Sequence, residues 1–253
     1  MSMAKKAKSD YLIQSVSRAL DLLEAFTTKE GDLGVTELAR KLKLHKNNVF
    51  RLLATLETRG YVEQDRATER YRLAPKVYEV AAVYLQHLDV RRQARVFLEA
   101  LALKCHETVC LGLLDRTFAV YVDMVESEQP VRVAPRLGRR FPAVAAAAGK
   151  VLLAALPREQ QMLLLGPEAA PALLEKLERV NAAGYAVDDE ECEVGVRSVA
   201  APIHDPANRA LGAIEVSAPA MRLSLEQIDA EIAPLVLSTA REVEARLGAK
   251  PAT

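Results

Sequence analysis

The segment VTELARKLKLHKNNVFRLLATLETRGYV (residues 35–62) constrains the fold of this 253-residue chain more than any other segment. Its apolar residues recur at helical spacing in two short runs, separated by a turn at Lys43 and Leu44. The small Ala39 lets two helices cross closely. Larger apolar residues fill the wedge between them: Leu38, Leu42, Leu44, Val49 and Leu52. This spacing predicts a helix-turn-helix, with Thr36 as the N-cap of the first helix.

Polar side chains lie outside this apolar core at the start of the second helix: His45, Lys46, Asn47, Asn48 and Arg51. In a helix-turn-helix the second helix enters the DNA major groove. Lys and Arg contact phosphates or guanine edges there, and Asn can pair with adenine. The alternative is a helical hairpin with an ordinary solvated face. The spacing, the local charge and the segment that follows together favour DNA binding.

That following segment, YVEQDRATERYRL (residues 61–73), alternates like two short strands around a charged turn, which is the wing of a winged helix. Residues 1–73 carry 14 Lys/Arg and 10 Asp/Glu, a net +4, whereas the remainder carries 20 and 24, a net −4. A basic module attached to an acidic one is typical of a polyanion-binding head. We expect DNA contacts from Thr36, Lys46, Asn47, Asn48, Arg51, Arg66 and Arg70.

After Pro75 the chain reads as helix almost to residue 106, with Asp89 able to cap a second helical stretch. Its apolar stripe could pack on its own domain or pair with a sister subunit, and the sequence leaves both open. From Val109 the period changes to that of strands: VCLGLLD, FAVYVDMVE and VRVAP. Helices are expected at 143–156, 158–165, 171–183 and 225–247, with Ser224 as the last N-cap, and two long strands before it. This order predicts an α+β domain with a mostly antiparallel sheet.

The run FPAVAAAAGKVLLAAL (residues 141–156) resembles a phosphate-binding loop only in its Gly149-Lys150 pair. Such a loop needs an earlier glycine and a following hydroxyl, but Val144 and Val151 stand at those positions. We therefore expect a buried helix whose small residues either permit close packing or leave room for a ligand. The lysine would bind the surface or a loop carbonyl.

No set of residues for catalysis is present: the four histidines are scattered, and no nucleophile or zinc motif occurs. The acidic residues 188–193 could bind a metal, although a solvated loop is the more ordinary interpretation. We expect no enzyme activity, no metal and no cofactor. Three cysteines without paired spacing fit a reducing compartment, and no apolar run is long enough for a membrane span or signal peptide. A cytoplasmic protein is expected.

The chain resembles IclR-type bacterial transcription regulators. The resemblance extends from about Ser15 to Arg246 and rests on motifs that match in order: SVSRALDLLEAF, VTELARKLKLHKNNVFRLLATLETRGYVEQD, ERYRL, HETVCLGLLD, YVDMVES, LGRRFPAVAAAAGKVLLAALP, GYAVDDEECEVGVRSVAAPI and LGAIEVSAP. It implies a winged helix-turn-helix domain (11–73), a linker helix (74–90) and a GAF-like effector-binding and oligomerisation domain (91–250). It also implies a homodimer or tetramer that binds a double-stranded DNA operator under the control of a small metabolite, often a carboxylic or aromatic acid.

The resemblance places an effector pocket at nine positions: Val133, Phe141, Ala147, Ala148, Asp188, Val196, Ser198, Glu215 and Ser217. The backbone N–H groups of Ala147 and Ala148, at a helix start, would suit a carboxylate. Three positions depart from some other members: Ala147 stands where some have Gly, Ser198 where some have Cys, and Glu215 where some have Ser.

Glu215 would repel an anionic effector unless it is protonated or paired, for example with Arg136, Arg139 or Arg140. A ligand that donates hydroxyl or amino hydrogens would relieve the same repulsion. The alternative function is a regulator whose second domain only oligomerises and binds no effector.

Overall fold

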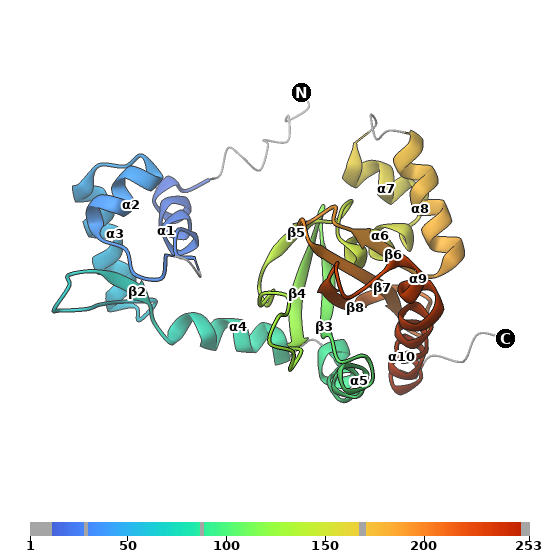
Figure 1. Cartoon of the computed structure of the whole chain (residues 1–253). Coiled ribbons are helices and arrows are strands. Elements are labelled where there is room, and N and C mark those ends of the chain that lie inside the picture. Colours follow the sequence, from blue (N-terminus) through green and yellow to red (C-terminus); the bar gives the residue numbers. More distant parts are fainter. Residues whose placement is uncertain (1–11, 28–29, 87–88, 167–170, 249–253) are drawn as a thin grey trace, which may run out of the picture. The chain divides into compact units, whose positions relative to one another are not determined.

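The computed structural model describes residues 12–27, 30–86, 89–166 and 171–248 (Figure 1). The chain separates into two compact units, residues 1–87 and residues 88–253. The division therefore falls inside the stretch 74–90 that we expected to link two domains. Among the described residues, no helix has the length and hydrophobicity needed to cross a membrane.

The first unit is a winged helix-turn-helix. Its elements are α1 (Gln14–Glu24), α2 (Val35–Leu42), α3 (Lys46–Thr58), β1 (Val62–Gln64), β2 (Tyr71–Leu73) and α4 (Lys76–Gln86). The two strands pair antiparallel, with Val62 opposite Leu73. One apolar core joins α1, α2 and α3 to both strands, and Leu38, Val49 and Leu53 are buried in it as the helical spacing predicted.

The start of α2 differs from our expectation. Gly34, not Thr36, is the N-cap, and its N–H donates to the Glu37 carboxylate at 2.8 Å. Thr36 is exposed inside the first turn and does not cap the helix. Glycine is tolerated at an N-cap, and the Glu37 side chain reaches back to pair the N–H of this N-cap residue. At the other end, Lys43 adopts the left-handed conformation (φ 55°, ψ 41°) that turns the chain toward α3.

The second unit is an α+β domain built on one antiparallel sheet in the order β5-β4-β3-β8-β7-β6. Its strands are β3 (Thr108–Asp115), β4 (Phe118–Val125), β5 (Arg140–Pro142), β6 (Ala186–Asp189), β7 (Val196–His204) and β8 (Ala210–Pro219). Its helices are α5 (Asp89–Cys105), α6 (Ala147–Ala154), α7 (Arg158–Leu165), α8 (Pro171–Ala183), α9 (Leu225–Gln227), the π-helical η2 (Ile228–Ile232) and α10 (Ala233–Arg246). Ser224 caps α9 as expected, its side chain accepting from the Gln227 N–H.

The helices cover the sheet in layers (Figure 1). α5 and α10 contact each other and pack on one face. α6 packs on β3, β7 and β8, and α8 contacts α6. The central strands β3 and β8 are thus buried on both faces, which explains their almost continuous burial.

Two expectations for the segment before α6 are wrong. Residues 131–135 form no strand, and the edge strand is β5 instead. In addition, α6 begins at Ala147 rather than at residue 143, because residues 143–146 form turns whose N–H groups bond to Thr117 and Pro142 carbonyls. The sequence suggested helix at Ala143 because a run of alanines has high helix propensity, and the tertiary hydrogen bond from the Ala143 N–H to the Thr117 carbonyl competes with it.

The small residues of α6 permit close packing on two sides. All eight residues of the helix are buried. A Cβ atom at Gly149 would lie 2.3 Å from the Cα atom of Ala143, and a Cβ atom at Gly112 in β3 would lie 3.0 Å from that of Ala148. Gly149 therefore lets the turn at Ala143 lie directly against α6.

We expect Gly149→Ala to lower the free energy of unfolding by about 1–3 kcal/mol, because overpacking costs that much. In an unobstructed helix the same change would stabilise by about 1 kcal/mol. Urea denaturation shows whether the substitution lowers or raises the free energy of unfolding. Gly31→Ala is the control, since a Cβ atom at Gly31 would meet nothing within 4 Å, and a stabilised Gly149→Ala variant would contradict the packing argument.

Candidate nucleic-acid interface and ligand site

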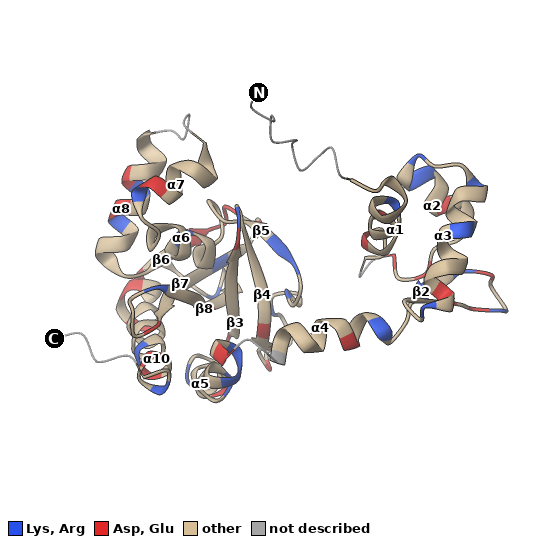
Figure 2. Ribbon diagram, turned by 180° about the vertical axis from the view of Figure 1, so that it is seen from behind, with Lys and Arg blue, Asp and Glu red and all other residues tan. Residues whose placement is uncertain are grey.

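The start of α3 presents polar side chains to solvent. Lys46, Asn47 and Arg51 are exposed, and Asn48 is half-buried. No acidic group among the described residues forms an ion pair with Lys46 or Arg51. Lys and Arg colour parts of α2 and α3 blue in Figure 2. This face could contact phosphates and base edges, as the sequence predicted.

The two arginines of the wing differ from each other. Arg66 is exposed in the turn between β1 and β2. Arg70 instead donates to the Asp32 carbonyl at 2.8 Å and pairs with Glu37 at 2.8 Å. The Gly34 amide and Arg70 lower the pKa of Glu37, which favours this pair. Arg70 therefore fastens the wing to the start of α2, and its contact with phosphate stays a prediction that would require part of this bonding to be released.

Phe50 is a residue of this face that the sequence analysis missed. It is 57% exposed on α3, one helical turn after Lys46. The available signal was an aromatic residue outside the apolar spacing of the helix. An exposed aromatic side chain beside Lys46 could meet a thymine methyl group.

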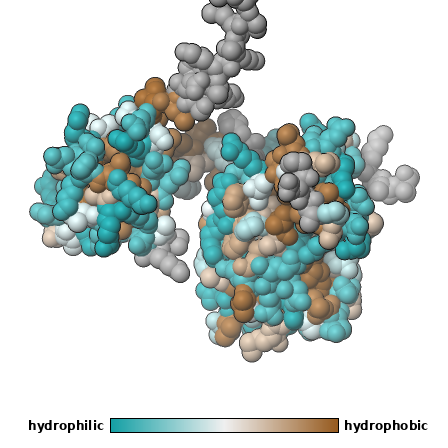
Figure 3. Space-filling model, turned by 90° about the horizontal axis from the view of Figure 1, so that it is seen from above, coloured by the Kyte–Doolittle hydropathy of each residue, from teal (hydrophilic) through white to brown (hydrophobic). Residues whose placement is uncertain are grey.

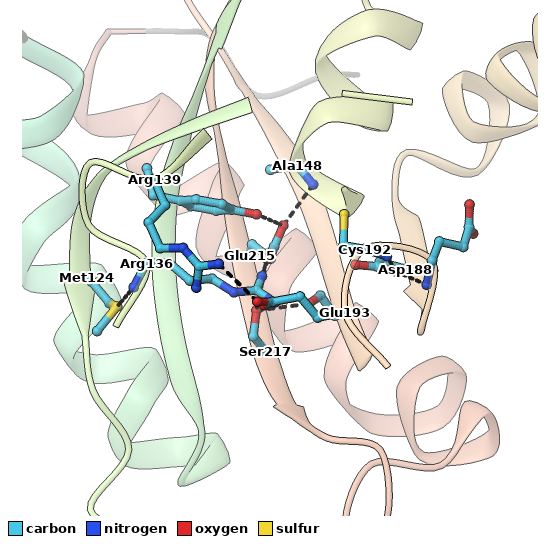
Figure 4. Close-up of polar contacts among 12 residues, drawn as sticks. Met124, Arg136, Arg139, Ala148, Asp188, Cys192, Glu193, Glu215 and Ser217 are labelled. Atoms are coloured by element: carbon cyan, nitrogen blue, oxygen red, sulfur yellow. Dashed lines mark hydrogen bonds and ion pairs between the residues drawn. The ribbon is translucent and has the colours of Figure 1, made fainter. Parts of the chain in front are cut away.

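In the second unit, Glu215 of β8 is fully buried at the N-terminus of α6 (Figure 4). Its carboxylate accepts four hydrogen bonds. Oε2 accepts from the Tyr121 hydroxyl at 2.7 Å and the Ala148 N–H at 2.9 Å, and Oε1 accepts from Arg136 Nη1 at 2.8 Å and the Ser217 hydroxyl at 2.8 Å. Of the alternatives raised by the sequence, the structure contains the paired carboxylate, and Arg136 is its partner.

Arg136 lies in the segment before β5 and is 1% exposed. Its Nη2 donates to Glu193 at 3.0 Å, and the other oxygen of Glu193 accepts from Arg139 at 3.1 Å. The rings of Phe141 and Tyr121 lie over its guanidinium group, 4.9 Å and 5.7 Å from ring centre to Cζ. Arg136 thus joins β8 to the acidic residues 188–193.

The structure brings most of the expected effector residues to this cluster. Ser198 lies opposite Ser217 in the β7–β8 register, and their hydroxyl oxygens are 2.9 Å apart. Asp188 of β6 is 1% exposed and accepts from the Glu191 and Cys192 N–H groups. Of the remaining positions, Phe141, Ala147 and Val133 are buried, whereas Val196 is half-buried at the start of β7. Neither valine takes part in the polar contacts.

Burial and neighbouring charges together shift the pKa values of the groups in and beside this cluster. Burial, followed by the charge of Glu215, raises the pKa of Tyr121 well above its ordinary value, so the phenol keeps its proton and donates it to Glu215. Burial opposes the charge of Arg136, but Glu215 and Glu193 raise its pKa above the usual range. Burial also raises the pKa of Cys192 to about 12, which keeps that thiol protonated at neutral pH.

Lys150 forms an ion pair with the acidic segment 188–193 through Glu191. The Lys150 ammonium group is buried and donates to the Val187 carbonyl at 2.8 Å and to Glu191. Burial lowers the pKa of Lys150, against the opposing effect of Glu191. Within the described ranges, no three His, Cys, Asp or Glu side chains are placed to hold a metal ion. The lysine therefore binds a carbonyl of strand β6 and a carboxylate, not the loop carbonyl that the sequence suggested.

Tyr121 and Glu193 were not among the expected site residues. The sequence offered little signal for either, because Tyr121 comes from β4 and Glu193 from a loop after β6, far from Glu215 along the chain. Strand order, not spacing, brings them together.

We expect Glu215→Gln to lower the free energy of unfolding by about 3 kcal/mol or more, because it leaves the buried Arg136 charge without a full partner. Chemical denaturation measures this. Glu126→Gln is the matched control, since Glu126 pairs with Arg132 at the surface and such pairs contribute about 1 kcal/mol or less. Equal effects of the two substitutions would contradict a structural role for the buried pair.

Comparison with known proteins agrees with both units. The family described as "IclR helix-turn-helix domain" matches residues 15–66, and "Bacterial transcriptional regulator IclR C-terminal" matches residues 82–245. The transcriptional regulator KdgR of Escherichia coli (strain K12) is 33% identical over 259 residues, covering 98% of each chain. XynR of the same strain is 34% identical over 233 residues, covering 88% of this chain and 91% of XynR.

Among solved structures, the IclR protein of Thermotoga maritima superposes with a TM-score of 0.74 at 29% identity, covering 93% of this chain and 99% of that one. The curated relatives are named as transcriptional regulators and not as enzymes. The chain therefore belongs to the IclR family of bacterial transcriptional regulators, with a DNA-binding helix-turn-helix domain followed by a C-terminal effector domain.

Proposed function

We propose that this protein is a transcriptional regulator whose binding to a DNA operator is controlled by a small metabolite, a carboxylic or aromatic acid. The single observation that carries the metabolite control is the buried polar cluster around Glu215 and Arg136. Buried charges cost stability unless fully paired, and such clusters concentrate at functional sites. A cytoplasmic location follows from the proposed contact with chromosomal DNA.

DNA recognition would use the start of α3. Lys46, Asn47, Asn48 and Arg51 would enter the major groove, and Arg66 of the wing would contact phosphates. The support is the exposure of these side chains and the lack of ion pairs at Lys46 and Arg51 within the described part of the chain. A cation that forms no internal ion pair can neutralise a phosphate without first breaking one.

The protein would bind its operator as a homodimer, or as a tetramer of two such dimers. An apolar groove lies between α1, α3 and α4 of the first unit, lined by Val16, Leu20, Leu52 and Val80 among others. Three large apolar side chains that line it are exposed: Val16, Leu20 and Val80. The same unit also exposes Ile13, Tyr78 and Tyr84. Brown side chains are visible on this unit in Figure 3. Contiguous exposed apolar surface of this kind favours a partner, and we assign a second copy of the chain to it.

We expect Lys46→Ala and Asn48→Ala each to weaken binding by about 5- to 150-fold, since a good base contact is worth about 1–3 kcal/mol. The DNA is a site selected by the wild-type protein from a random library, and binding is measured by fluorescence anisotropy. Lys76→Ala is the control, because it removes the same charge from α4 of the same unit.

Unchanged affinity in both folded α3 variants would refute the assignment of α3. The same titration gives the stoichiometry, and two protomers on a site with two half-sites is the expected result. One protomer per site would refute the dimer.

For the effector, we expect at least one compound in a panel of aliphatic and aromatic acids to raise the melting temperature of the full chain. A ligand at 100 times its Kd adds about 2.7 kcal/mol, which corresponds to roughly 5–10 °C for a domain of this size. The same compound must change operator affinity. A panel without any response would favour the alternative, in which the second domain only oligomerises.

A further inference from the structure

One nitrogen of the buried cluster has no partner. Among the described residues, the Nε atom of Arg136 is a buried side-chain donor without any acceptor. The rest of the guanidinium group is engaged: Nη1 donates to Glu215 and Ser217, and Nη2 donates to Glu193. A buried donor without an acceptor costs about 1–3 kcal/mol, so an acceptor atom placed at this nitrogen would be stabilising.

The geometry of the guanidinium group specifies that acceptor. Nε and Nη2 lie on the same edge of the plane, and their two N–H bonds match the two oxygens of one carboxylate. Glu193 uses half of this edge, because one of its oxygens binds Nη2 and the other binds Arg139. The ring centres of Tyr121 and Phe141 lie 5.7 Å and 4.9 Å from the guanidinium carbon. An incoming carboxylate that takes the place of Glu193 meets this edge where Glu193 now lies (Figure 4).

The N-terminus of α6 does not offer a second anchor. Glu215 already accepts the Ala148 N–H and is fully buried. A ligand carboxylate placed there would add a second negative charge beside Glu215 in a dry environment, which is strongly unfavourable. The position that a carboxylate could occupy without changing the local charge is that of Glu193.

We propose that a small-molecule carboxylate binds the Nε–Nη2 edge of Arg136 by displacing Glu193, which acts as a resident competitor for that edge. The proposal rests on the metabolite-controlled function above and names the anchor of the metabolite. The exchange conserves charge, since one carboxylate replaces another. It also gains a hydrogen bond, because a ligand can use both Nε and Nη2 whereas Glu193 uses Nη2 alone.

Glu193 is able to leave. Its side chain is 29% exposed, and it lies in the segment between β6 and β7, where the chain turns at Gly195 (φ 81°). A tethered carboxylate competes with an effective concentration on the order of millimolar. A ligand displaces Glu193 below millimolar concentration only if it also accepts from Arg136 Nε and makes further contacts. Its departure also unfastens this segment from Arg136 and Arg139, which gives ligand binding a structural consequence.

Acetate is the direct probe, because it is the carboxylate end of a glutamate side chain. We expect acetate to raise the melting temperature of full-length Glu193→Ala, with an apparent affinity at least tenfold higher than for the wild-type protein. Acetamide, which has the same shape without the charge, should have no such effect on either protein. Glu231→Ala removes an exposed carboxylate from the same unit and should behave like wild type.

A second variant locates the site. In the double variant Glu193→Ala/Arg139→Gln, acetate should still stabilise, because Arg136 keeps both N–H groups of its edge. Loss of the effect there would place acetate on Arg139 and overturn the proposal. So would equal acetate affinities of wild type and Glu193→Ala, no acetate effect on Glu193→Ala, or an equal effect of acetamide.

The acetate measurements test the carboxylate site, whereas operator affinity tests the proposed function, so the two can fail independently. Operator affinity without any ligand tests DNA binding in every variant. An acid panel that never changes operator affinity, together with acetate binding to Glu193→Ala, would leave the carboxylate site in place and remove its regulatory role.

Discussion

The buried contact between Glu215 and Arg136 determines how the second unit is assembled. A carboxylate with no solvent exposure must find its hydrogen-bond donors inside the protein. Glu215 takes them from β4, β8, the start of α6 and the segment before β5. None of these four elements can shift without leaving a buried charge incompletely paired, so one interaction fixes their mutual positions.

This requirement explains the small residues of α6. The Ala148 N–H reaches Glu215 only because the helix lies directly on the sheet, where Gly112 leaves room for the Ala148 side chain. On the opposite side Gly149 allows the turn at Ala143 to close over the helix. Lys150 then binds the Val187 carbonyl and Glu191, so the same helix also holds the acidic segment that contributes Glu193. The alanine run allows close packing of α6 on the sheet, and this packing places the Ala148 N–H beside the Glu215 carboxylate.

The second unit buries a paired arginine, whereas the first unit leaves several cations exposed to solvent. Its ion pair between Arg70 and Glu37 fastens the wing to α2, whereas Lys46, Arg51 and Arg66 remain exposed. A surface for nucleic acid needs cations that are not already neutralised, whereas the second unit holds its buried charges in pairs. The first unit thus exposes its cations, and the second unit neutralises its buried ones.

The sequence by itself determined the order of most elements, because apolar periodicity is a local property. The helix-turn-helix, the wing, α7, α8 and the long strands β7 and β8 all follow from spacing and from breakers such as Gly184. The family's motifs also predicted nine effector positions, among them Glu215, whose carboxylate departs from some members.

Only the tertiary structure decided how that carboxylate is satisfied. Arg136 could not be chosen over Arg139 and Arg140 from the sequence, since the choice depends on which side chain the loop before β5 turns inward. The sequence also did not show that residues 131–135 form no strand and that α6 starts late. Before α6, the Ala143 N–H bonds to the carbonyl of Thr117, and no spacing within the segment records this partner.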